Sequence, residues 1–258
     1  MIELLLTCAV VFFGFLLVFF AGVRWKKHDL IDIFWGMSFV LSALTSFALG
    51  PRSAMGLVAT AVTVFWGLRL SVHLAQRNLS KPEDPRYRAM REKWGPNVER
   101  NMFFKVYLSQ FALSLFIGAP VLYMNLTEGT PLGFWTFLGV FVWLLGIVFE
   151  SLADAQLRAH LKKHPGELMT RGLWSWSRHP NYFGESLIWW GVFFQALNRG
   201  PSALWLILSP ILITSLLVFV TGVPLTERRM EKRPGWAAYR QKTSRFFPWP
   251  PKKESKAS

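Results

Sequence analysis

Long apolar runs alternate with short charged segments along this chain. A membrane-spanning helix requires about 20 predominantly apolar residues, and six runs approach or exceed that length: residues 2–23, 33–49, 54–74, 102–124, 132–153 and 202–223. A seventh run at residues 181–197 is shorter and contains Glu185. We interpret it as a full helix rather than a re-entrant segment. The pattern therefore predicts an all-α integral membrane protein with about seven transmembrane helices.

The basic residues gather in alternate loops of this prediction. With the N-terminus outside, the inner segments 24–27, 77–100, 158–178 and 228–256 contain 3, 7, 5 and 10 Lys or Arg residues, which is 25 of 29. The outer loops contain only Arg52 and Arg199. Because cytoplasmic loops are rich in Lys and Arg, we predict a cytoplasmic C-terminus and a bacterial inner-membrane location. Topology also explains the net charge of +14, so we expect no nucleic-acid partner.

No repeat of fixed period is visible, and we predict one membrane domain over residues 1–258. The single cysteine, Cys8, lies within the first apolar run and cannot form a disulfide or a cysteine-based metal site within the chain. The sequence also lacks a GxGxxG motif, a Walker GKS or GKT loop, an HExxH motif and a nucleophile elbow. We therefore expect no metal, and any nucleotide must be held by a fold other than a Rossmann or P-loop domain.

The most varied group of polar side chains lies in GLWSWSRHPNYFGE at residues 172–185. It combines two cations, an amide, a phenol and a carboxylate: Arg178, His179, Asn181, Tyr182 and Glu185. Pro180 suits the first turn of a helix because its missing N–H would be unpaired there in any case. The next N–H groups then lie beside the cations, an arrangement that attracts phosphate or carboxylate. A loop facing lipid headgroups also explains the cations, but the variety of polar groups favours a site.

Three charged residues end the fifth apolar run at fourfold spacing, which places Glu150, Asp154 and Arg158 on one face of a helix. A solvated ion pair is the ordinary explanation of Asp154 with Arg158. Glu150 lies deeper, where a carboxylate without a partner is costly. It is therefore a candidate acceptor for hydrogen bonds from a ribose or an amide.

The inner loop at residues 82–94 reads PEDPRYRAMREKW and predicts a short amphipathic helix. Arg86, Tyr87 and Arg91 form a candidate site in which arginines clamp a phosphate and stack on an adenine. The alternative is that these side chains rest at the membrane interface, where Arg, Tyr and Trp are common. Composition alone leaves both interpretations open.

A few polar residues lie inside the predicted spans. Asp32 and Arg69 are candidates for an interhelical ion pair, and His73 lies one helical turn beyond Arg69. Tyr107 near the start of the fourth run either lines a cavity or forms hydrogen bonds between helices. The segment 223–248 predicts a helix leaving the membrane, a turn at residues 233–235 and a short helix that ends before Pro248.

In their order along the chain, these motifs resemble the steroid 5-alpha reductase family. The resemblance rests on the 172–185 segment, on Glu227-Arg228 and on residues 239–248, and it covers about residues 29–249. PED-x-RY at residues 82–87 and AD-x-Q at residues 153–156 resemble an uncharacterised bacterial branch most closely. A similar RHPxYxG element occurs in sterol reductases and in isoprenylcysteine carboxyl methyltransferases.

The resemblance implies an NADPH-dependent enzyme that reduces a C=C bond of a lipid, steroid-like or isoprenoid substrate entering from the bilayer. Asp154 and Arg158 match the polar helix of the family, Asn181 and Glu185 match its N-x-x-G-E element, and Tyr239 matches a tyrosine before the terminal proline. The remaining expected cofactor contacts are Arg86, Tyr87, Arg91, Glu150, Arg178, His179, Tyr182, Glu227 and Arg228. The Gln-Glu pair of steroid-type members is not evident, which argues against a 3-keto steroid.

Such a reduction needs a hydride donor, an acid and a pocket without water. Tyr107 and His73 are the candidate catalytic acids. An alternative is methyl transfer from S-adenosylmethionine held by Glu227 and the same basic loop, which requires alignment but no acid. A third possibility is a non-enzymatic lipid-binding scaffold on the same fold. The sequence does not determine the oligomeric state.

Overall fold

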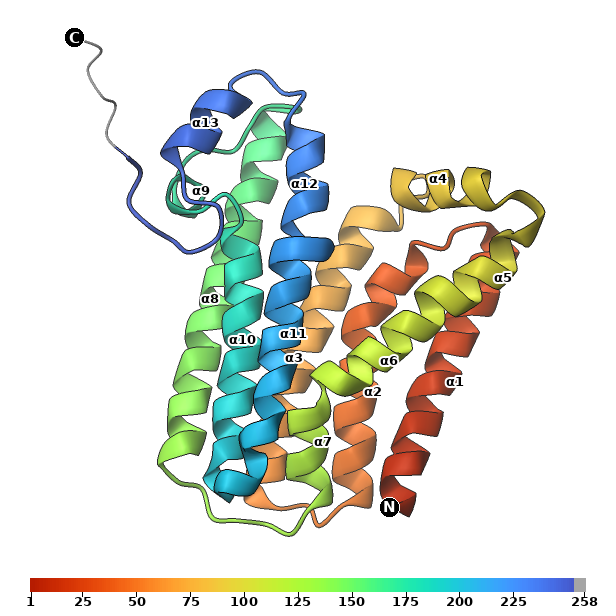
Figure 1. Cartoon of the computed structure of the whole chain (residues 1–258), viewed down its shortest axis with the longest axis vertical. Coiled ribbons are helices and arrows are strands. Elements are labelled where there is room, and N and C mark those ends of the chain that lie inside the picture. The colour runs from red at the N-terminus through yellow and green to blue at the C-terminus, as the bar shows by residue number, and fades with distance from the viewer. Residues whose placement is uncertain (253–258) are drawn as a thin grey trace. The chain divides into compact units, whose positions relative to one another are not determined.

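The computed structural model describes residues 1–252, and it divides the chain into two compact units. Unit 1 contains Met1–Thr136 and Gln195–Leu206, and unit 2 contains Phe137–Phe194 and the chain from Ile207 onward. Apart from one isolated bridge between Ser177 and Ser244, the regular elements within residues 1–252 are helices (Figure 1). The prediction of an all-α protein is therefore confirmed.

The helices follow the apolar runs closely. Unit 1 contains α1 (Ile2–Trp25), α2 (Leu30–Leu49), α3 (Ala54–Asn78), α4 (Pro85–Trp94), η1 (Gly95–Asn97), α5 (Val98–Met102), the π-helix η2 (Phe103–Tyr107), α6 (Leu108–Ile117), α7 (Ala119–Leu126) and η3 (Leu197–Arg199). The helix η4 (Pro201–Ile207) ends where unit 2 resumes. Unit 2 contains nearly all of α8 (Phe134–Lys163) and of α10 (Pro180–Ala196). It also contains α9 (Leu173–Trp176), α11 (Leu208–Ser215), the π-helix η5 (Leu216–Val220), α12 (Val223–Met230) and α13 (Trp236–Lys242).

Five helical stretches within residues 1–252 are long and apolar enough to cross a membrane: α1, α2, α3, α8 and the continuous stretch Pro201–Met230. A sixth is added if the bent pair Pro85–Ile117 and Ala119–Leu126 forms one span. The shorter run at residues 181–197 is helical, as predicted, and α10 begins at Pro180. With 17 residues, α10 is slightly shorter than the roughly 20 residues of a typical span. These helices support an integral membrane protein.

The pattern alone suggested that the fourth apolar run forms one straight helix. In the structure, this helix is bent. The axis bends by 54° between Ile117 and Ala119. Pro120 lies in the first turn of α7 and has no N–H to continue the hydrogen bonds of α6, so the helix breaks at Gly118. Apolar length alone does not reveal this bend, because it depends on a Gly-Ala-Pro sequence within the run.

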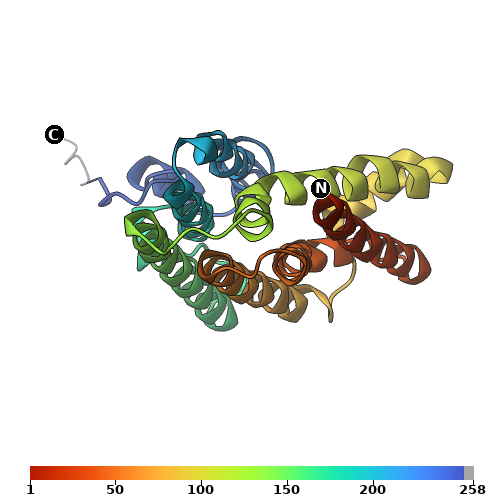
Figure 2. The same ribbon diagram turned by 90° about the horizontal axis from the view of Figure 1, so that it is seen from below.

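In unit 1, α2 packs against both α1 and α3, the red and orange helices of Figure 2. A Cβ atom added to Gly67 of α3 would lie 2.6 Å from the carbonyl oxygen of Gly36 in α2, so glycine permits this close approach. Asn125 attaches α7 to the same pair, since its Nδ2 donates to the carbonyl of Ala43 at 3.1 Å and to Thr60 Oγ1 at 3.0 Å.

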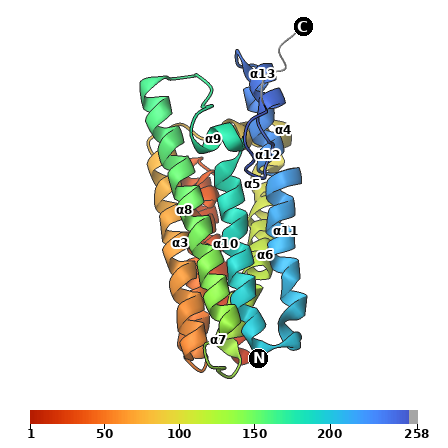
Figure 3. The same ribbon diagram turned by 90° about the vertical axis from the view of Figure 1, so that its left-hand side faces the viewer.

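In unit 2, α8 and α10 pack with their backbones in close contact (Figure 3). Gly184 and Gly191 lie seven residues apart on α10, and a Cβ atom on either would lie within 2.7 Å of the α8 backbone, at the carbonyl oxygens of Gly146 and Gly139 respectively. Small residues at this spacing allow helices to meet without a side chain between them. The contact brings the polar residues at the adjoining ends of α8 and α10 to one level.

Candidate functional site

The structure divides the predicted site residues between the two units. Unit 2 contains Glu150, Asp154, Arg158, Arg178, His179, Asn181, Tyr182, Glu185, Glu227, Arg228 and Tyr239. Unit 1 contains Arg86, Tyr87, Arg91 and the two candidate acids His73 and Tyr107. Within each unit, hydrogen bonds join several of these residues, and the contacts show what the side chains can do.

Arg178 is the central residue of the unit 2 network and is only 7% exposed. Its Nε donates to Glu227 Oε1 at 2.8 Å, and its Nη1 donates to the carbonyls of Arg240 at 3.0 Å and Thr243 at 2.7 Å. The Arg178 backbone N–H donates to the Ser244 carbonyl at 2.9 Å. Arg178 therefore fastens α12 and the segment after α13 to the start of α10.

His179 extends this attachment to α12. Its Nε2 lies 3.3 Å from Glu227 Oε1, and its ring stacks on Tyr182 with centroids 5.5 Å apart. The Tyr182 hydroxyl lies 3.2 Å from Thr226 Oγ1. Burial lowers the pKa of His179, although the hydrogen bond to Glu227 acts in the opposite direction. The imidazole is therefore predominantly neutral at pH 7.

Tyr239 and the GLWSW segment join α13 to α8. The Tyr239 hydroxyl donates to the Trp174 carbonyl at 2.6 Å, and Trp174 Nε1 donates to the Ala153 carbonyl at 3.0 Å. The backbone N–H of Leu173 donates to Gln156 Oε1 at 3.0 Å. Burial raises the pKa of Tyr239, which keeps its phenol protonated. The AD-x-Q and GLWSW segments are therefore joined directly, with the GLWSW segment supplying the donors and the AD-x-Q segment the acceptors.

The C-terminal half of α8 and the N-terminal half of α10 bring acidic and amide groups together. Glu150, Asp154 and Glu185 are buried, and Asn181 Nδ2 lies 3.4 Å from Asp154 Oδ1. Asn181 Oδ1 is buried and accepts no hydrogen bond from the described residues. Leaving such an atom unpaired typically costs about 1–3 kcal/mol. Asn181 is therefore the residue of this group best suited to accept a hydrogen bond from a ligand.

Two cations of unit 2 lie at its surface. The side chains of Arg158 on α8 and Arg228 on α12 are exposed. Arg178, by contrast, is buried. Exposed guanidinium groups are suited to phosphate groups because they present several donors in one plane.

In unit 1, the PED-x-RY loop is fastened to the start of α2. Glu83 Oε1 accepts from the His28 backbone N–H at 2.7 Å and from Arg91 Nη2 at 3.0 Å. The Asp84 backbone N–H donates to Asp29 Oδ2 at 2.9 Å. The loop motif thus holds the connection between α1 and α2 in place.

Asp32 of α2 accepts hydrogen bonds from Arg86 and Tyr87, two of the three residues that we considered as ligands of a phosphate and an adenine. Arg86 Nη2 and the Tyr87 hydroxyl each lie 2.6 Å from its carboxylate oxygens. Arg86, Tyr87 and Arg91 therefore all bind carboxylates of their own unit. Arg86 and Tyr87 hold α4 against α2, whereas Arg91 binds the loop residue Glu83.

Tyr107 belongs to a buried chain of hydrogen-bonding groups that we did not predict. Its hydroxyl lies 3.2 Å from His28 Nδ1, and His28 Nε2 lies 3.0 Å from Glu99 Oε2. His28 is fully buried, whereas the Glu99 side chain is 40% exposed. A Cβ atom on Gly22 would lie 2.7 Å from the Tyr107 hydroxyl. The absence of a side chain there leaves room for the contact between phenol and imidazole.

The local backbone also distinguishes Tyr107, because it is the last residue of the π-helical turn Phe103–Tyr107. Such turns occur frequently at functional sites. The only sequence signal for His28 was its position directly before Asp29, shortly after the first apolar run. The other candidate acid, His73, lies on α3 and is partly buried.

Comparison with known proteins identifies a family model that matches most of the chain and a relative that matches part of it. A family model described as "Protein of unknown function (DUF1295)" matches residues 6–243. The uncharacterised protein C594.04c of Schizosaccharomyces pombe is 28% identical over 170 residues. That match covers 57% of this chain and 48% of the relative, so the chain spans about half the length of that protein. No solved structure matches the chain.

Replacement of Arg178 by Gln should destabilise unit 2 strongly. Removing one partner of a buried ion pair typically costs about 3–5 kcal/mol, and Glu227 would lose its closest partner. We expect a lower melting temperature in detergent and faster proteolysis after Lys242 and Arg245. Arg171→Gln, which removes an exposed charge, serves as the control, and equal stability of the two variants would contradict the assigned role.

Stability should fall as the pH is lowered below about 6.5. Burial lowers the pKa of both His28 and His179 from an ordinary value of about 6.5. Below that pH the two histidines bind more protons in the unfolded chain than in the folded protein. The stabilisation present at higher pH is therefore lost. Melting temperatures between pH 7.5 and 5 should show a smaller decline for His179→Gln than for the exposed control His164→Gln. Identical declines would rule out this contribution.

Proposed function

The chain belongs to the DUF1295 family, and we propose that it is a membrane-embedded, NADPH-dependent reductase acting on a C=C bond of a lipid, steroid-like or isoprenoid substrate. One observation carries the proposal. The segments that resemble steroid 5-alpha reductases lie far apart in sequence, yet hydrogen bonds join Asp154 to Asn181 and Arg178 to both Glu227 and Thr243. The resemblance therefore corresponds to one physical network within unit 2.

The groups present suit the chemistry of NADPH. Its ribose hydroxyls and its carboxamide N–H groups can donate to the buried oxygen of Asn181, which lacks a donor among the described residues. The exposed guanidinium groups of Arg158 and Arg228 suit its phosphates, including the 2′-phosphate that distinguishes NADPH from NADH. Arg178 and Tyr239 have a supporting role, because their donors hold the surrounding segments. When bound, the cofactor supplies the hydride.

The second requirement of the reaction is a proton for the other carbon of the double bond. We assign this role to the Tyr107 hydroxyl, since an ordinary phenol remains protonated at neutral pH. His28 and Glu99 follow it in one hydrogen-bonded chain. A proton that leaves Tyr107 is replaced through the imidazole of His28 and the partly exposed Glu99 from water. His73 is retained as the alternative acid.

The proposed topology has seven spans, an outer N-terminus and a cytoplasmic C-terminus. Two contacts in unit 1 support the charge argument. Lys27 Nζ donates to the carbonyls of Asn78 at 2.9 Å and Leu79 at 3.3 Å, so the basic segments after α1 and α3 lie at one end. Arg199 Nη2 donates at 2.8 Å to the carbonyl of Thr127, which directly follows the C-terminal end of α7. Cytoplasmic loops are expected to carry the greater positive charge.

A reporter fused after Ser258 tests this topology. Alkaline phosphatase is active only outside the cytoplasm and green fluorescent protein fluoresces only inside it, so we expect fluorescence without phosphatase activity. A fusion after Arg52 should give the opposite pair of results. Phosphatase activity at Ser258 would contradict the proposed orientation.

Ligand-dependent melting of the detergent-solubilised protein tests the cofactor assignment, because a ligand that binds only the folded state raises its stability. We expect NADPH to raise the melting temperature more than NADH does. Asn181→Ala should weaken apparent NADPH affinity by roughly tenfold, since a lost hydrogen bond is typically worth about 0.5–1.5 kcal/mol and more beside a charge. Gln241→Ala removes an exposed amide of α13 and should leave affinity unchanged.

The other outcomes separate the remaining functions. Stabilisation by S-adenosylmethionine alone would replace the reductase proposal with methyl transfer, and no stabilisation by any of the three ligands would favour a lipid-binding scaffold. Tyr107→Phe should retain NADPH-induced stabilisation but lose oxidation of NADPH in the presence of a lipid enone. Retained turnover in this variant would remove Tyr107 from the mechanism.

A further inference from the structure

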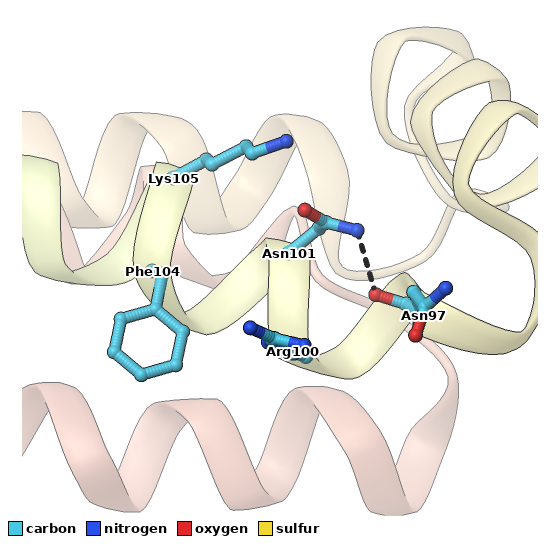
Figure 4. Close-up of a pocket in the computed structure, with 5 residues that line it drawn as sticks. All are labelled: Asn97, Arg100, Asn101, Phe104 and Lys105. Atoms are coloured by element: carbon cyan, nitrogen blue, oxygen red, sulfur yellow. Dashed lines mark hydrogen bonds between the residues drawn. The ribbon is translucent and has the colours of Figure 1, made fainter.

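A surface pocket of about 320 Å³ lies along the start of the fourth apolar run in unit 1. It is lined by Asn97, Arg100, Asn101, Phe104 and Lys105 (Figure 4). These residues come from one continuous stretch that passes from η1 through α5 into the π-helix η2. Spacings of four residues place their side chains in adjoining rows, and Asn101 Nδ2 donates to the Asn97 carbonyl at 3.0 Å.

The pocket carries two positive charges that are not neutralised. Arg100 and Lys105 are exposed, and within residues 1–252 neither forms a salt bridge. Lys105 Nζ lies 5.4 Å from the centroid of the Trp94 ring. The adjacent acid, Glu99, faces His28 at 3.0 Å and lies 3.7 Å from Arg91. The pocket therefore has a local charge that suits an anion.

The pocket becomes apolar toward the membrane. Phe104 is 57% exposed, and Leu108, one turn further along the helix, is 36% exposed. Arg100, Phe104 and Leu108 thus form one row at fourfold spacing, with a cation first and two apolar side chains after it. The row enters the apolar run at residues 102–124, so the cations lie at the level where a helix passes from headgroups to acyl chains.

From this arrangement we propose that the pocket binds the phosphate of an anionic glycerophospholipid, whose acyl chain follows Phe104 and Leu108. Arg100 supplies a planar group of donors for the phosphate oxygens and Lys105 a second charge. Basic residues at the cytoplasmic surface are attracted to anionic lipids. A soluble phosphate would use the cations but not the apolar row, which is why a lipid fits better. The site is independent of the proposed reductase activity.

The test measures melting of the full chain in a neutral detergent as short-chain phosphatidylglycerol, phosphatidylcholine or inorganic phosphate is added. We expect phosphatidylglycerol to stabilise the protein at lower concentration than phosphatidylcholine. The double variant Arg100→Gln/Lys105→Gln should weaken its apparent affinity by on the order of tenfold or more, because two cations near the anion are lost. Phe104→Ala should weaken the lipid effect without changing any response to inorganic phosphate.

The control Arg24→Gln/Lys93→Gln removes the same charge from exposed positions of unit 1 outside the pocket and should retain the wild-type affinity. Equal weakening in both double variants would show diffuse attraction and overturn the proposal. Stabilisation by inorganic phosphate that equals the lipid effect would reassign the pocket to a soluble anion. If the pocket variant melts early without lipid, Lys105→Gln alone provides the comparison, and an unchanged affinity there would also count against the proposal.

Discussion

Every polar group that this chain carries into apolar surroundings needs a partner within the protein, because the interior of a bilayer offers no water to replace it. Helix formation pairs the backbone N–H and C=O groups with each other, and the buried side chains determine which helices are neighbours. Asp32 satisfies Arg86 and Tyr87 in unit 1, and Glu227 satisfies Arg178 in unit 2. The regions rich in mixed charge are therefore also the regions where helices and loops are fastened together.

This requirement changes the interpretation of the RHPNYFGE segment. The side chain of its buried cation, Arg178, binds one carboxylate and two backbone carbonyls. The backbone N–H of Arg178 binds a third carbonyl. Arg178 organises the site and has little capacity left for a ligand. Asn181 lies three residues further on, at the beginning of α10, and retains a buried oxygen with no donor among the described residues. Within one short motif, structural and ligand-binding roles thus belong to different residues.

The networks of the two units differ in their chemistry. Unit 2 joins acidic, amide and basic groups that suit a nucleotide cofactor, whereas unit 1 contains a phenol connected through His28 to a partly exposed carboxylate. The glycine contacts in each unit serve the same purpose, since helices that lack side chains at their contact can bring polar groups to one level. Packing of small residues therefore prepares the positions of the polar ones.

The sequence by itself determined the helical class, the approximate bounds of most long helices, the start of α10 at Pro180 and the turn before α13, because apolar length, charge and proline geometry act locally. The partners of Asp32, the link from Tyr107 to His28 and the unpaired oxygen of Asn181 were decided only by tertiary structure. The first two depend on atoms that segments distant in sequence bring within about 3 Å of each other, and the third depends on the lack of a donor within that distance among the described residues. Spacing along one helix shows which side chains share a face, but it does not identify the helix that the face will meet.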